Sequence, residues 1–371
     1  MKTVLITGST GFIGRNLSAT LEQDKEISLL HFNRSNSLEE LDALIKQSDF
    51  IFHLAGVNRP KVESEFDQGN RELTERILKS ITDSGRKVPI LITSSVQAEL
   101  DNPYGKSKKA AEDATILWSK ENGSKAYVYR LPNVFGKWSA PQYNSVVATF
   151  CNNIAKGLDI TINDPKTIIT LVYIDDVVEE FIKVLKSSDK IQGEEFRSIP
   201  REFKISLDEL VKKIYFFKNN RNDLINPNFE DIFDRFLFAT FTSYLDQEDF
   251  GYNLEMKRDD RGWLAEFIKS HQFGQIFISR TKPGISRGNH WHHTKIEKFL
   301  VVEGEAEIKL RNYGTDKLVS YKVSGDDLKV VDMPAGYVHS IKNTGSKDLI
   351  TIFWADEIFN PDKPDTYYLE V

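Results

Sequence analysis

Short apolar segments alternate with amphipathic stretches over roughly the first half of the chain. The apolar segments predict strands at 3–7, 27–32, 50–54, 89–93 and 126–131. The amphipathic stretches between them predict helices, for example at 13–21, 72–84 and 107–120. Because this alternation builds a parallel sheet with helices on both faces, we predict a Rossmann-like, doubly wound α/β domain.

The pattern changes twice further along the chain. Residues 206–245 look helical, and aromatic side chains that we assign to a core recur there at Phe229, Phe233, Phe236, Phe241 and Tyr244. A polar, acidic stretch at 246–251 marks a domain boundary. Short β-rich segments separated by turn residues follow, at 275–280, 298–302, 306–311, 328–332 and 349–354. We therefore predict two domains, 1–245 and 246–371, of which the second is a small β-barrel or sandwich.

The composition is that of an ordinary globular protein and excludes several classes. Of the 371 residues, 40% are hydrophobic and 28% are charged, which argues against a disordered or fibrous chain. A net charge of −6 offers no electrostatic footprint for nucleic acid or an anionic membrane. No apolar run reaches the roughly 18 residues of a membrane span. A single cysteine, Cys151, fits a reducing compartment, so we predict a cytoplasmic protein.

A glycine-rich turn follows the first predicted strand and opens the first predicted helix. Its residues are Gly8, Ser9, Thr10, Gly11, Phe12, Ile13 and Gly14. The glycines permit a tight turn and a close backbone approach, so that the pyrophosphate of a dinucleotide can lie on the helix N-terminus. After the second strand come Asn33, Arg34 and Ser35, with no acid before Glu39, which favours NADPH over NAD. We predict that this turn, together with Asn33 and Arg34, binds NADPH.

A tyrosine and a lysine four residues apart lie at the start of a later helix. Tyr104 and Lys108 share one helix face. An ammonium near a phenol lowers the pKa of the phenol, which makes it usable in proton transfer. Upstream, Ser94 and Ser95 end a strand at the carboxyl edge of the sheet, where ligands bind in open α/β folds. These four side chains are our candidate catalytic residues.

Together these motifs resemble the extended short-chain dehydrogenase/reductase family, specifically its nucleotide-sugar branch. Three more segments carry the resemblance: His53-Leu54-Ala55-Gly56, Arg130-Leu131-Pro132-Asn133-Val134-Phe135-Gly136 and Tyr173-Ile174-Asp175-Asp176-Val177. The resemblance implies that Tyr104 is the catalytic acid/base, that Lys108 orients the nicotinamide ribose, and that a serine polarises the carbonyl. It also implies cofactor contacts from Leu54 and Ala55 and substrate contacts from Arg130 and Asn133.

Two departures from the family pattern narrow the activity. The family usually has Val-Tyr-Gly after the catalytic serine, whereas this chain has Val96-Gln97-Ala98-Glu99 and a short connection to Tyr104. Either Ser94 or Ser95 can therefore be the catalytic hydroxyl. The 4,6-dehydratases of the family carry an Asp-Glu pair directly after that hydroxyl, and Val96 and Gln97 cannot replace it in the elimination of water. We therefore do not expect a dehydratase.

A cluster of histidines occupies the C-terminal domain. His290 and His292 alternate along a predicted strand and so point to one face, while His293 points to the other. With Glu297 and the distant His339 they supply three nitrogens and one oxygen, a set that suits Zn²⁺, Mn²⁺, Fe²⁺ or Ni²⁺. We predict one divalent metal ion per chain, with Zn²⁺ as the expected ion.

These residues match both motifs of the cupin family, which implies an all-β cupin barrel. The matching positions are Gly284, His290, His292, Glu297 and Gly304 in the first motif and Pro334, Gly336, His339 and Asn343 in the second. Leu328 stands where the second motif usually opens with glycine. Two segments, Asp260-Arg261-Gly262 and Arg287-Gly288-Asn289-His290, also look like the cupin-fold sugar-nucleotide epimerases of the deoxyrhamnose pathway. In those enzymes the histidine is a base, so His290 has two candidate roles.

The fusion of a reductase to a cupin resembles the bifunctional enzymes of capsular polysaccharide biosynthesis over essentially the whole chain. This resemblance implies that the cupin epimerises carbon 3 of a UDP-2-acetamido-2,6-dideoxy-4-hexulose. The N-terminal domain would then reduce the 4-keto group with NADPH to a UDP-N-acetyl-6-deoxy-talosamine-type product, on the route to UDP-N-acetyl-L-fucosamine. Candidate bases for the first step are His293, Lys295, Lys298 and Tyr337. Both folds commonly dimerise, so we expect a homodimer, with no nucleic-acid or membrane partner.

Two other functions stay open at this point. One is a UDP-sugar 4-epimerase with tightly bound NAD, in which the cupin serves only for oligomerisation. The other is a protein that binds a nucleotide or a sugar without catalysis. The intact Tyr104–Lys108 pair and the full ligand set argue against the second, because a binding protein needs neither.

Overall fold

A six-stranded parallel sheet forms the centre of the N-terminal part of the chain. Its strand order is β2-β1-β3-β4-β5-β8, and every neighbouring pair is parallel. The strands are β1 (Lys2–Thr7), β2 (Ile27–Phe32), β3 (Phe50–His53), β4 (Ile90–Ser95), β5 (Ala126–Leu131) and β8 (Glu194–Arg197). The order reverses between β1 and β3, which is the switch point where open α/β sheets bind ligands. The predicted doubly wound α/β class is confirmed.

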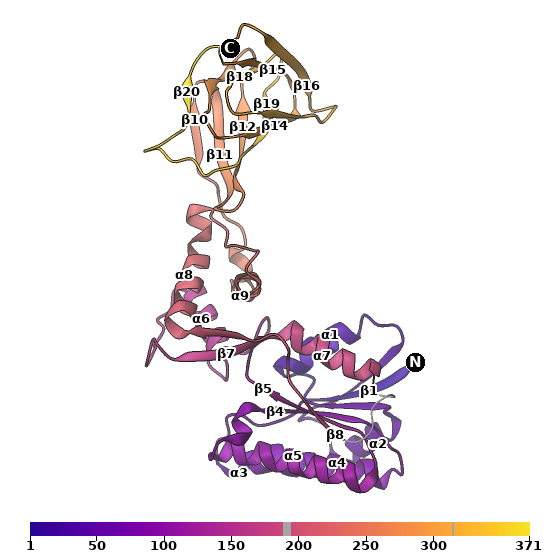
Figure 1. Ribbon diagram of the computed structural model, residues 1–371. Coiled ribbons are helices and arrows are strands. Elements are labelled where there is room, and N and C mark those ends of the chain that lie inside the picture. The colour runs from indigo at the N-terminus through magenta and orange to yellow at the C-terminus, as the bar shows by residue number, and fades with distance from the viewer. Residues whose placement is uncertain (188–193, 314) are drawn as a thin grey trace. The chain divides into compact units, whose positions relative to one another are not determined.

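Helices cover both faces of this sheet (Figure 1). They are α1 (Phe12–Leu21) and α7 (Ile174–Ser187) on one face and α2 (Leu38–Gln47), α4 (Leu73–Asp83) and α5 (Pro103–Asn122) on the other. On the first face Phe181 of α7 packs against Phe52 and Tyr129, with ring centroids 6.0 and 5.0 Å apart. On the second face, fully buried Ile77 and Ile81 of α4 join Ile90 and the other inward strand residues in one apolar cluster. Burial on both faces explains why the strands are almost continuously apolar.

Helix α5 begins earlier than its apolar pattern indicates. We predicted a helix at 107–120, whereas the helix starts at Pro103. Asn102 caps it, because its side-chain oxygen accepts a hydrogen bond from the Gly105 amide at 2.8 Å, and proline is favoured in a first helical turn. Tyr104 and Lys108 therefore both lie in the first two turns.

A second, three-stranded sheet joins the N-terminal unit. It contains β6 (Asn133–Phe135), β7 (Ile168–Tyr173) and β9 (Phe203–Ser206), and α6 (Val146–Ala155) lies between β6 and β7 in the chain. The predicted helical region is split into α8 (Leu207–Asp223) and α9 (Ile232–Thr242). Of the predicted aromatic core, Phe233 and Phe241 are buried and Phe236 stacks on Tyr173 at 4.0 Å. Phe229 is 44% exposed, so its assignment to the core was wrong.

The C-terminal strands form two antiparallel sheets. One has the order β10-β11-β12-β19-β14-β17, and its strands are β10 (Met256–Asp259), β11 (Gly262–Ser270), β12 (Gly274–Thr281), β14 (Glu297–Glu303), β17 (Val330–Met333) and β19 (Leu349–Ala355). The other has the order β16-β15-β18-β13-β20, and its strands are β13 (Ser286–Trp291), β15 (Glu305–Asn312), β16 (Leu318–Ser324), β18 (Tyr337–Asn343) and β20 (Tyr367–Tyr368).

Alternating side chains of the two C-terminal sheets build a common core. Phe299 and Phe353 of the first sheet meet Ile308, Leu310 and Ile341 of the second in one cluster of buried residues. The predicted all-β cupin class is confirmed. The strand predicted at 328–332 begins instead at Val330, and Leu328 is 64% exposed.

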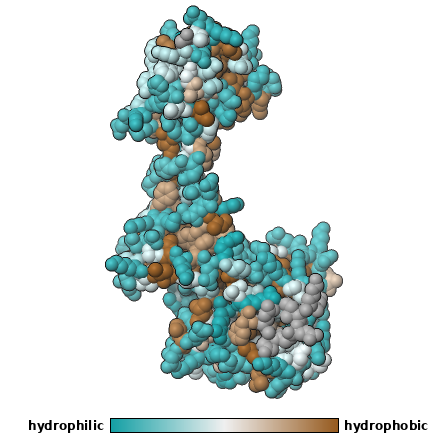
Figure 2. Space-filling view, in the orientation of Figure 1, coloured by the Kyte–Doolittle hydropathy of each residue, from teal (hydrophilic) through white to brown (hydrophobic). Residues whose placement is uncertain are grey.

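The computed structural model describes residues 1–187, 194–313 and 315–371. It divides into an N-terminal unit, Met1–Ile214 with Phe236–Leu245, and a C-terminal unit, Tyr215–Arg235 with Asp246–Val371. The residues Tyr215–Arg235, which we expected in the first domain, thus group with the second, and the boundary after residue 245 stays a prediction. Among the described helices none is long and apolar enough to cross a membrane. The face in Figure 2 is mainly hydrophilic, with hydrophobic residues dispersed over it.

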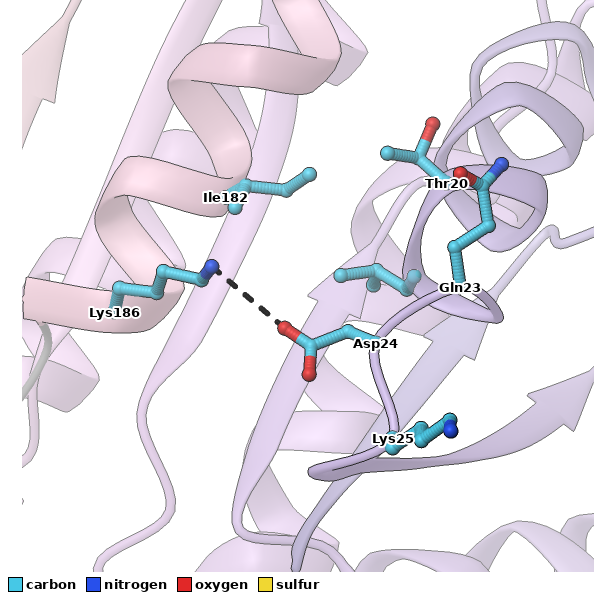
Figure 3. Close-up of a pocket in the computed structure, with 7 residues that line it drawn as sticks. Thr20, Gln23, Asp24, Lys25, Ile182 and Lys186 are labelled. Atoms are coloured by element: carbon cyan, nitrogen blue, oxygen red, sulfur yellow. Dashed lines mark ion pairs between the residues drawn. The ribbon is translucent and has the colours of Figure 1, made fainter.

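One surface hollow lies away from the predicted sites. It is a depression of about 320 Å³ between the C-terminal end of α1 and the last turns of α7. Lys186 reaches across it to Asp24, with 3.6 Å between the charged atoms (Figure 3). The glycine-rich turn is at the opposite end of α1, so this hollow is not a dinucleotide site.

Candidate active site and metal centre

The glycine-rich turn is a close contact between three backbone segments. Gly8 has a positive φ of 71°, and a Cβ atom there would lie 2.7 Å from the Ala55 amide nitrogen. A Cβ atom on Gly14 would lie 2.2 Å from the Gly8 carbonyl oxygen. Gly11 caps α1 without any side-chain hydrogen bond to the cap, so no side chain competes for the amides at the start of this helix. A phosphate can bind there.

Asn33 connects the end of β2 to this turn. Its side-chain oxygen accepts hydrogen bonds from the Ser9 hydroxyl at 3.0 Å and from the Thr10 amide at 3.2 Å. Arg34 follows directly and is exposed. The predicted NADPH residues Asn33 and Arg34 are therefore beside the glycine-rich turn, while the choice of NADPH over NAD stays a prediction.

The end of β3 brings the predicted Leu54 and Ala55 to the same place. The Leu54 amide donates to the Thr7 carbonyl at 3.2 Å, and the Ala55 amide lies 3.3 Å from the Thr7 hydroxyl. His53 is buried between the hydroxyls of Thr7 and Thr74, at 2.8 and 2.9 Å. Burial and the nearby Lys108 ammonium lower the pKa of His53 to about 3, so the ring is neutral. His53 holds the strand end in place.

Tyr104 contacts one of the two candidate serines. The Ser95 hydroxyl lies close enough to the Tyr104 phenol to lower the pKa of that phenol, and it also accepts a hydrogen bond from the Gln97 amide at 3.1 Å. The Ser94 hydroxyl oxygen is buried and has no hydrogen-bond partner among the described residues. Burial raises the pKa of Tyr104, and the Ser95 hydroxyl opposes that rise. We predicted the opposite direction for this pKa, because we expected the Lys108 ammonium to act on the phenol.

Lys108 instead directs its ammonium to the backbone. Its Nζ atom donates to the Thr93 carbonyl at 2.9 Å, and the residue is 8% exposed. Burial lowers the pKa of Lys108 to about 8, although the neighbouring Glu112 carboxylate opposes that shift. Tyr104, Lys108 and Ser95 thus converge at the carboxyl ends of β4 and β5, beside the glycine-rich turn.

Arg130 has polar partners that sequence reasoning missed. Its guanidinium binds the fully buried Glu112 carboxylate through two bonds of 2.8 and 2.7 Å, and it pairs with Glu99 at 2.6 Å. The predicted substrate contact of Arg130 stays a prediction, and this ion pair argues against it. Asn133 is exposed at the start of β6, where its side chain donates to the Thr170 carbonyl at 3.3 Å.

The predicted metal ligands lie together in the C-terminal unit. One ligand atom from each of His290, His292, Glu297 and His339 lies within 4.8 Å of the others. The Nε2 atoms of His292 and His339 are 3.3 and 3.2 Å from Glu297 Oε2, yet none of these three buried atoms makes a well-directed hydrogen bond. A divalent cation requires converging nitrogen and oxygen atoms with free lone pairs. These buried atoms without hydrogen-bond partners meet that requirement, so the residues fit the predicted metal.

Backbone carbonyls fix the orientation of two of these imidazoles. His292 Nδ1 lies 2.6 Å from the Asp365 carbonyl oxygen, and His339 Nδ1 lies 3.1 Å from the Tyr337 carbonyl oxygen. Because a carbonyl only accepts, each Nδ1 atom carries the proton, and each Nε2 atom presents a lone pair to the cluster. The two cupin motifs are joined here as well, since the Gly336 amide donates to the His292 carbonyl at 2.8 Å.

Charge in the cluster also suits a cation. Burial acts to raise the pKa of Glu297, but the adjacent His292 and His339 imidazoles outweigh it and lower the pKa below its usual range. Burial, assisted by His339, lowers the pKa of His290 to about 4. At neutral pH the site therefore presents a carboxylate and a neutral His290 imidazole.

Three of the four candidate bases are engaged elsewhere. The His293 ring packs on Trp291, with ring centroids 4.4 Å apart, just beyond the end of β13. Lys295 is buried and donates to the Pro364 carbonyl at 3.0 Å, while Lys298 pairs with Asp332. Tyr337 is two residues before His339 on β18 and packs against the apolar core. Of the two candidates that lie in strands, alternation places Tyr337 on the face of His339 and Lys298 on the face opposite Glu297.

Comparisons with known proteins agree with both halves of this description. Residues 4–197 match the NAD dependent epimerase/dehydratase family, and residues 257–367 match the polysaccharide biosynthesis C-terminal domain. The chain is 43% identical to UDP-2-acetamido-2,6-beta-L-arabino-hexul-4-ose reductase of Pseudomonas aeruginosa, over 99% of this chain and 98% of that one.

Two solved structures extend the comparison. The capsular polysaccharide assembling protein CapF from Staphylococcus aureus superposes with a TM-score of 0.92 and 45% identity, over 99% of this chain and 100% of that one. UDP-glucuronic acid 4-epimerase from Bacillus cereus superposes with a TM-score of 0.53 and 16% identity, over 58% of this chain and 83% of that one. The second likeness concerns the fold alone.

Replacement of Arg130 with alanine tests its ion pair. We expect the free energy of unfolding to fall by roughly 3 kcal/mol, because the buried Glu112 carboxylate loses its partner. Urea unfolding of the full chain measures this loss. Lys106→Ala, which removes an exposed cation from α5, the helix that carries Glu112, should change stability by less than about 0.5 kcal/mol. Unchanged stability of Arg130→Ala together with a raised KM for the sugar would instead place Arg130 at the substrate.

Replacement of Lys108 with methionine tests the buried ammonium. Between pH 8 and the ordinary pKa of 10.5, the folded chain binds fewer protons here than the unfolded chain, so this lysine destabilises the fold below pH 8 and less so as the pH rises. We expect Lys108→Met to be more stable than the wild type by about 2 kcal/mol at pH 7. That gain in stability should shrink as the pH rises toward 10.5. The variant should also be about 100-fold less active than the wild type. A stability difference that does not vary with pH would contradict the buried, shifted ammonium.

Proposed function

The chain belongs to the family of the capsular polysaccharide enzyme CapF, and from that premise we propose that it is a bifunctional nucleotide-sugar enzyme. We assign reduction of a UDP-linked 4-keto-deoxy-sugar to residues 1–245, with NADPH as reductant. We assign epimerisation at carbon 3 of the same sugar to a metal site in residues 246–371. The expected sugar is a UDP-2-acetamido-2,6-dideoxy-4-hexulose, and the printed name of the Pseudomonas relative supports that substrate class.

The reductase assignment rests on the convergence of Tyr104, Ser95 and Lys108 beside the glycine-rich turn. That turn, with Asn33 and Arg34, would hold NADPH, which would supply hydride to carbon 4 of the sugar. Tyr104 delivers the proton that the carbonyl oxygen needs to become a hydroxyl. Ser95 donates a hydrogen bond to the same oxygen, where charge develops. Lys108 lies on α5, and its buried ammonium, which donates to the Thr93 carbonyl of β4, would orient the cofactor.

The epimerase assignment rests on the buried, unpaired ligand atoms of the C-terminal cluster. A divalent cation held by His290, His292, Glu297 and His339 would act as a Lewis acid toward the keto oxygen and so acidify the proton on carbon 3. A side chain on the ligand face removes that proton, and its return to the other face of the sugar inverts carbon 3. Tyr337 is our candidate for one of these transfers, because the other candidates point away or are paired.

The product would be a UDP-N-acetyl-6-deoxy-talosamine-type sugar on the route to UDP-N-acetyl-L-fucosamine. Zn²⁺ as the metal, a homodimer and a cytoplasmic location stay predictions. The proximity of the Ser95 hydroxyl to the Tyr104 phenol is the single observation that carries the reductase proposal, because it brings a proton donor and a carbonyl-polarising hydroxyl together near the cofactor turn.

Oxidation of NADPH by the full chain tests the reductase. With the UDP-linked 4-keto sugar, NADPH absorbance should fall in proportion to the sugar reduced. Ser95→Ala should slow the reaction about 100-fold through loss of a hydrogen bond to the developing oxyanion. The matched control, Ser94→Ala, removes the neighbouring hydroxyl, which has no hydrogen-bond partner among the described residues, and should stay within about tenfold of the wild type.

Two other results would redirect the interpretation. Unchanged NADPH absorbance with the 4-keto sugar, together with inversion of carbon 4 in a UDP-sugar that carries a hydroxyl there, would favour the alternative of a 4-epimerase with tightly bound NAD. A greater loss in Ser94→Ala than in Ser95→Ala would contradict the role given to Ser95.

A further inference from the structure

Asp365 lies near the end of the chain, in the segment that leads into β20. It has a positive φ of 34°, a backbone conformation that aspartate and asparagine tolerate better than most residues. Two residues later the chain enters β20, whose Tyr367 and Tyr368 pair with Trp291 and His290 of β13. The segment thus pairs with the strand that carries the proposed ligand His290 and that ends one residue before His292.

The Asp365 carboxylate accepts four hydrogen bonds from the loop between β13 and β14. One oxygen accepts from the His293 amide at 2.9 Å. The other accepts from the Thr294 amide, the Thr294 hydroxyl and the Lys295 amide, each at 3.0 Å. These backbone bonds lower the pKa of Asp365 although burial acts to raise it, so the group is a carboxylate at neutral pH. It holds three successive residues of the loop in one conformation.

The backbone carbonyl of the same residue binds a ligand directly. The Asp365 carbonyl oxygen lies 2.6 Å from His292 Nδ1, which fixes the plane of that ring and the tautomer with Nε2 facing the cluster. The loop held by the carboxylate runs from His292 to Glu297, the first residue of β14. One residue therefore orients a histidine ligand and fixes the connection between two ligands.

Lys295 strengthens this attachment from the opposite side. Its buried ammonium donates to the Pro364 carbonyl at 3.0 Å and to the Thr366 hydroxyl at 3.3 Å. The loop and the terminal segment are therefore cross-bonded in both directions around Asp365. We therefore expect substitution of Asp365 to alter the positions of the metal-ligand side chains.

We propose that Asp365 is a positioning residue of the metal centre, which sets the orientation of His292 and its spacing from Glu297. This inference rests on the proposed metal function of the cluster. Asp365 does not touch the cation in this proposal. It acts through the imidazole that its carbonyl fixes and through the loop that its carboxylate binds.

Asp365→Asn isolates the role of the carboxylate. Asparagine accepts the same positive φ, so the carbonyl that binds His292 keeps its backbone position. The amide offers one accepting oxygen instead of two, and its NH₂ group must face loop donors that the carboxylate had satisfied. The matched control is Asp362→Asn, which makes the same charge change at an exposed residue of the same segment, whose carboxylate has no hydrogen bond to the loop among the described residues.

The measurement is Zn²⁺ affinity of the full chain by competition with a chromogenic chelator, at a temperature where every variant is folded. We expect Asp365→Asn to bind Zn²⁺ about 10- to 100-fold more weakly than the wild type, and Asp362→Asn to match the wild type. A variant that unfolds at a lower temperature but binds Zn²⁺ as tightly as the wild type would show a merely structural role and overturn the proposal. If the wild type itself binds no metal, the proposed metal centre fails first, so the two failures are distinguishable.

Hydrogen exchange of the wild type supplies a test that does not need a folded variant. Coupling between the metal and the loop is reciprocal, so Zn²⁺ should slow exchange of the His293, Thr294 and Lys295 amides. Exchange at these amides that does not respond to bound Zn²⁺ would overturn the role of Asp365 even where Asp365→Asn cannot be purified.

Discussion

Pairing of buried polar groups is the constraint on which both candidate sites depend. A polar atom removed from water costs free energy unless it finds a partner, and a buried charge costs more. In the N-terminal unit Lys108 donates a hydrogen bond to the Thr93 carbonyl, and Glu112 forms an ion pair with Arg130. In the C-terminal unit the Nδ1 atoms of His292 and His339 form hydrogen bonds with backbone carbonyls. The Nε2 atoms of both imidazoles and one Glu297 oxygen have no such partner, which indicates a cation.

The same constraint explains how α5 serves the reductase site. Its first turns carry Tyr104 and Lys108, and Glu112 follows one turn later on the same face. The bidentate bond from Arg130 of β5 to Glu112 ties this helix to the strand beside β4. Precise placement of Tyr104 against Ser95 at the end of β4 therefore depends on an ion pair remote from the reacting atoms.

Much of the fold could be predicted from the sequence, because the hydrophobic patterns there are strong. The predicted strands at 27–32 and 126–131 match β2 and β5 residue for residue. The start of α5 could not be predicted from its apolar period, because the Asn102 cap and Pro103 precede the first apolar residues. The exposed Phe229 shows the limit of aromatic spacing, which does not reveal the break between α8 and α9.

The candidate sites divide in the same way. The four metal ligands were predictable because their spacing is tied to strand alternation and to a two-motif pattern. The choice of Ser95 over Ser94 depends on the strand end and could not be made from adjacent serines. The bond between Arg130 and Glu112 could not be predicted, because nothing in the sequence spacing connects β5 with the middle of α5. Without that bond, Arg130 was assigned to the substrate. Asp365 had no local signal, because its partners lie some seventy residues earlier in the chain.

Two chemically separate sites in one chain form the central claim, and deuterium exchange tests it most directly. The 4-keto sugar is incubated in deuterated water without NADPH, and deuterium at carbon 3 is measured by NMR. The wild type and Tyr104→Phe should both incorporate deuterium, whereas His290→Ala combined with His339→Ala should not. Absence of deuterium with the wild type, or incorporation that survives loss of both histidines, would contradict a metal-site epimerase in the C-terminal unit.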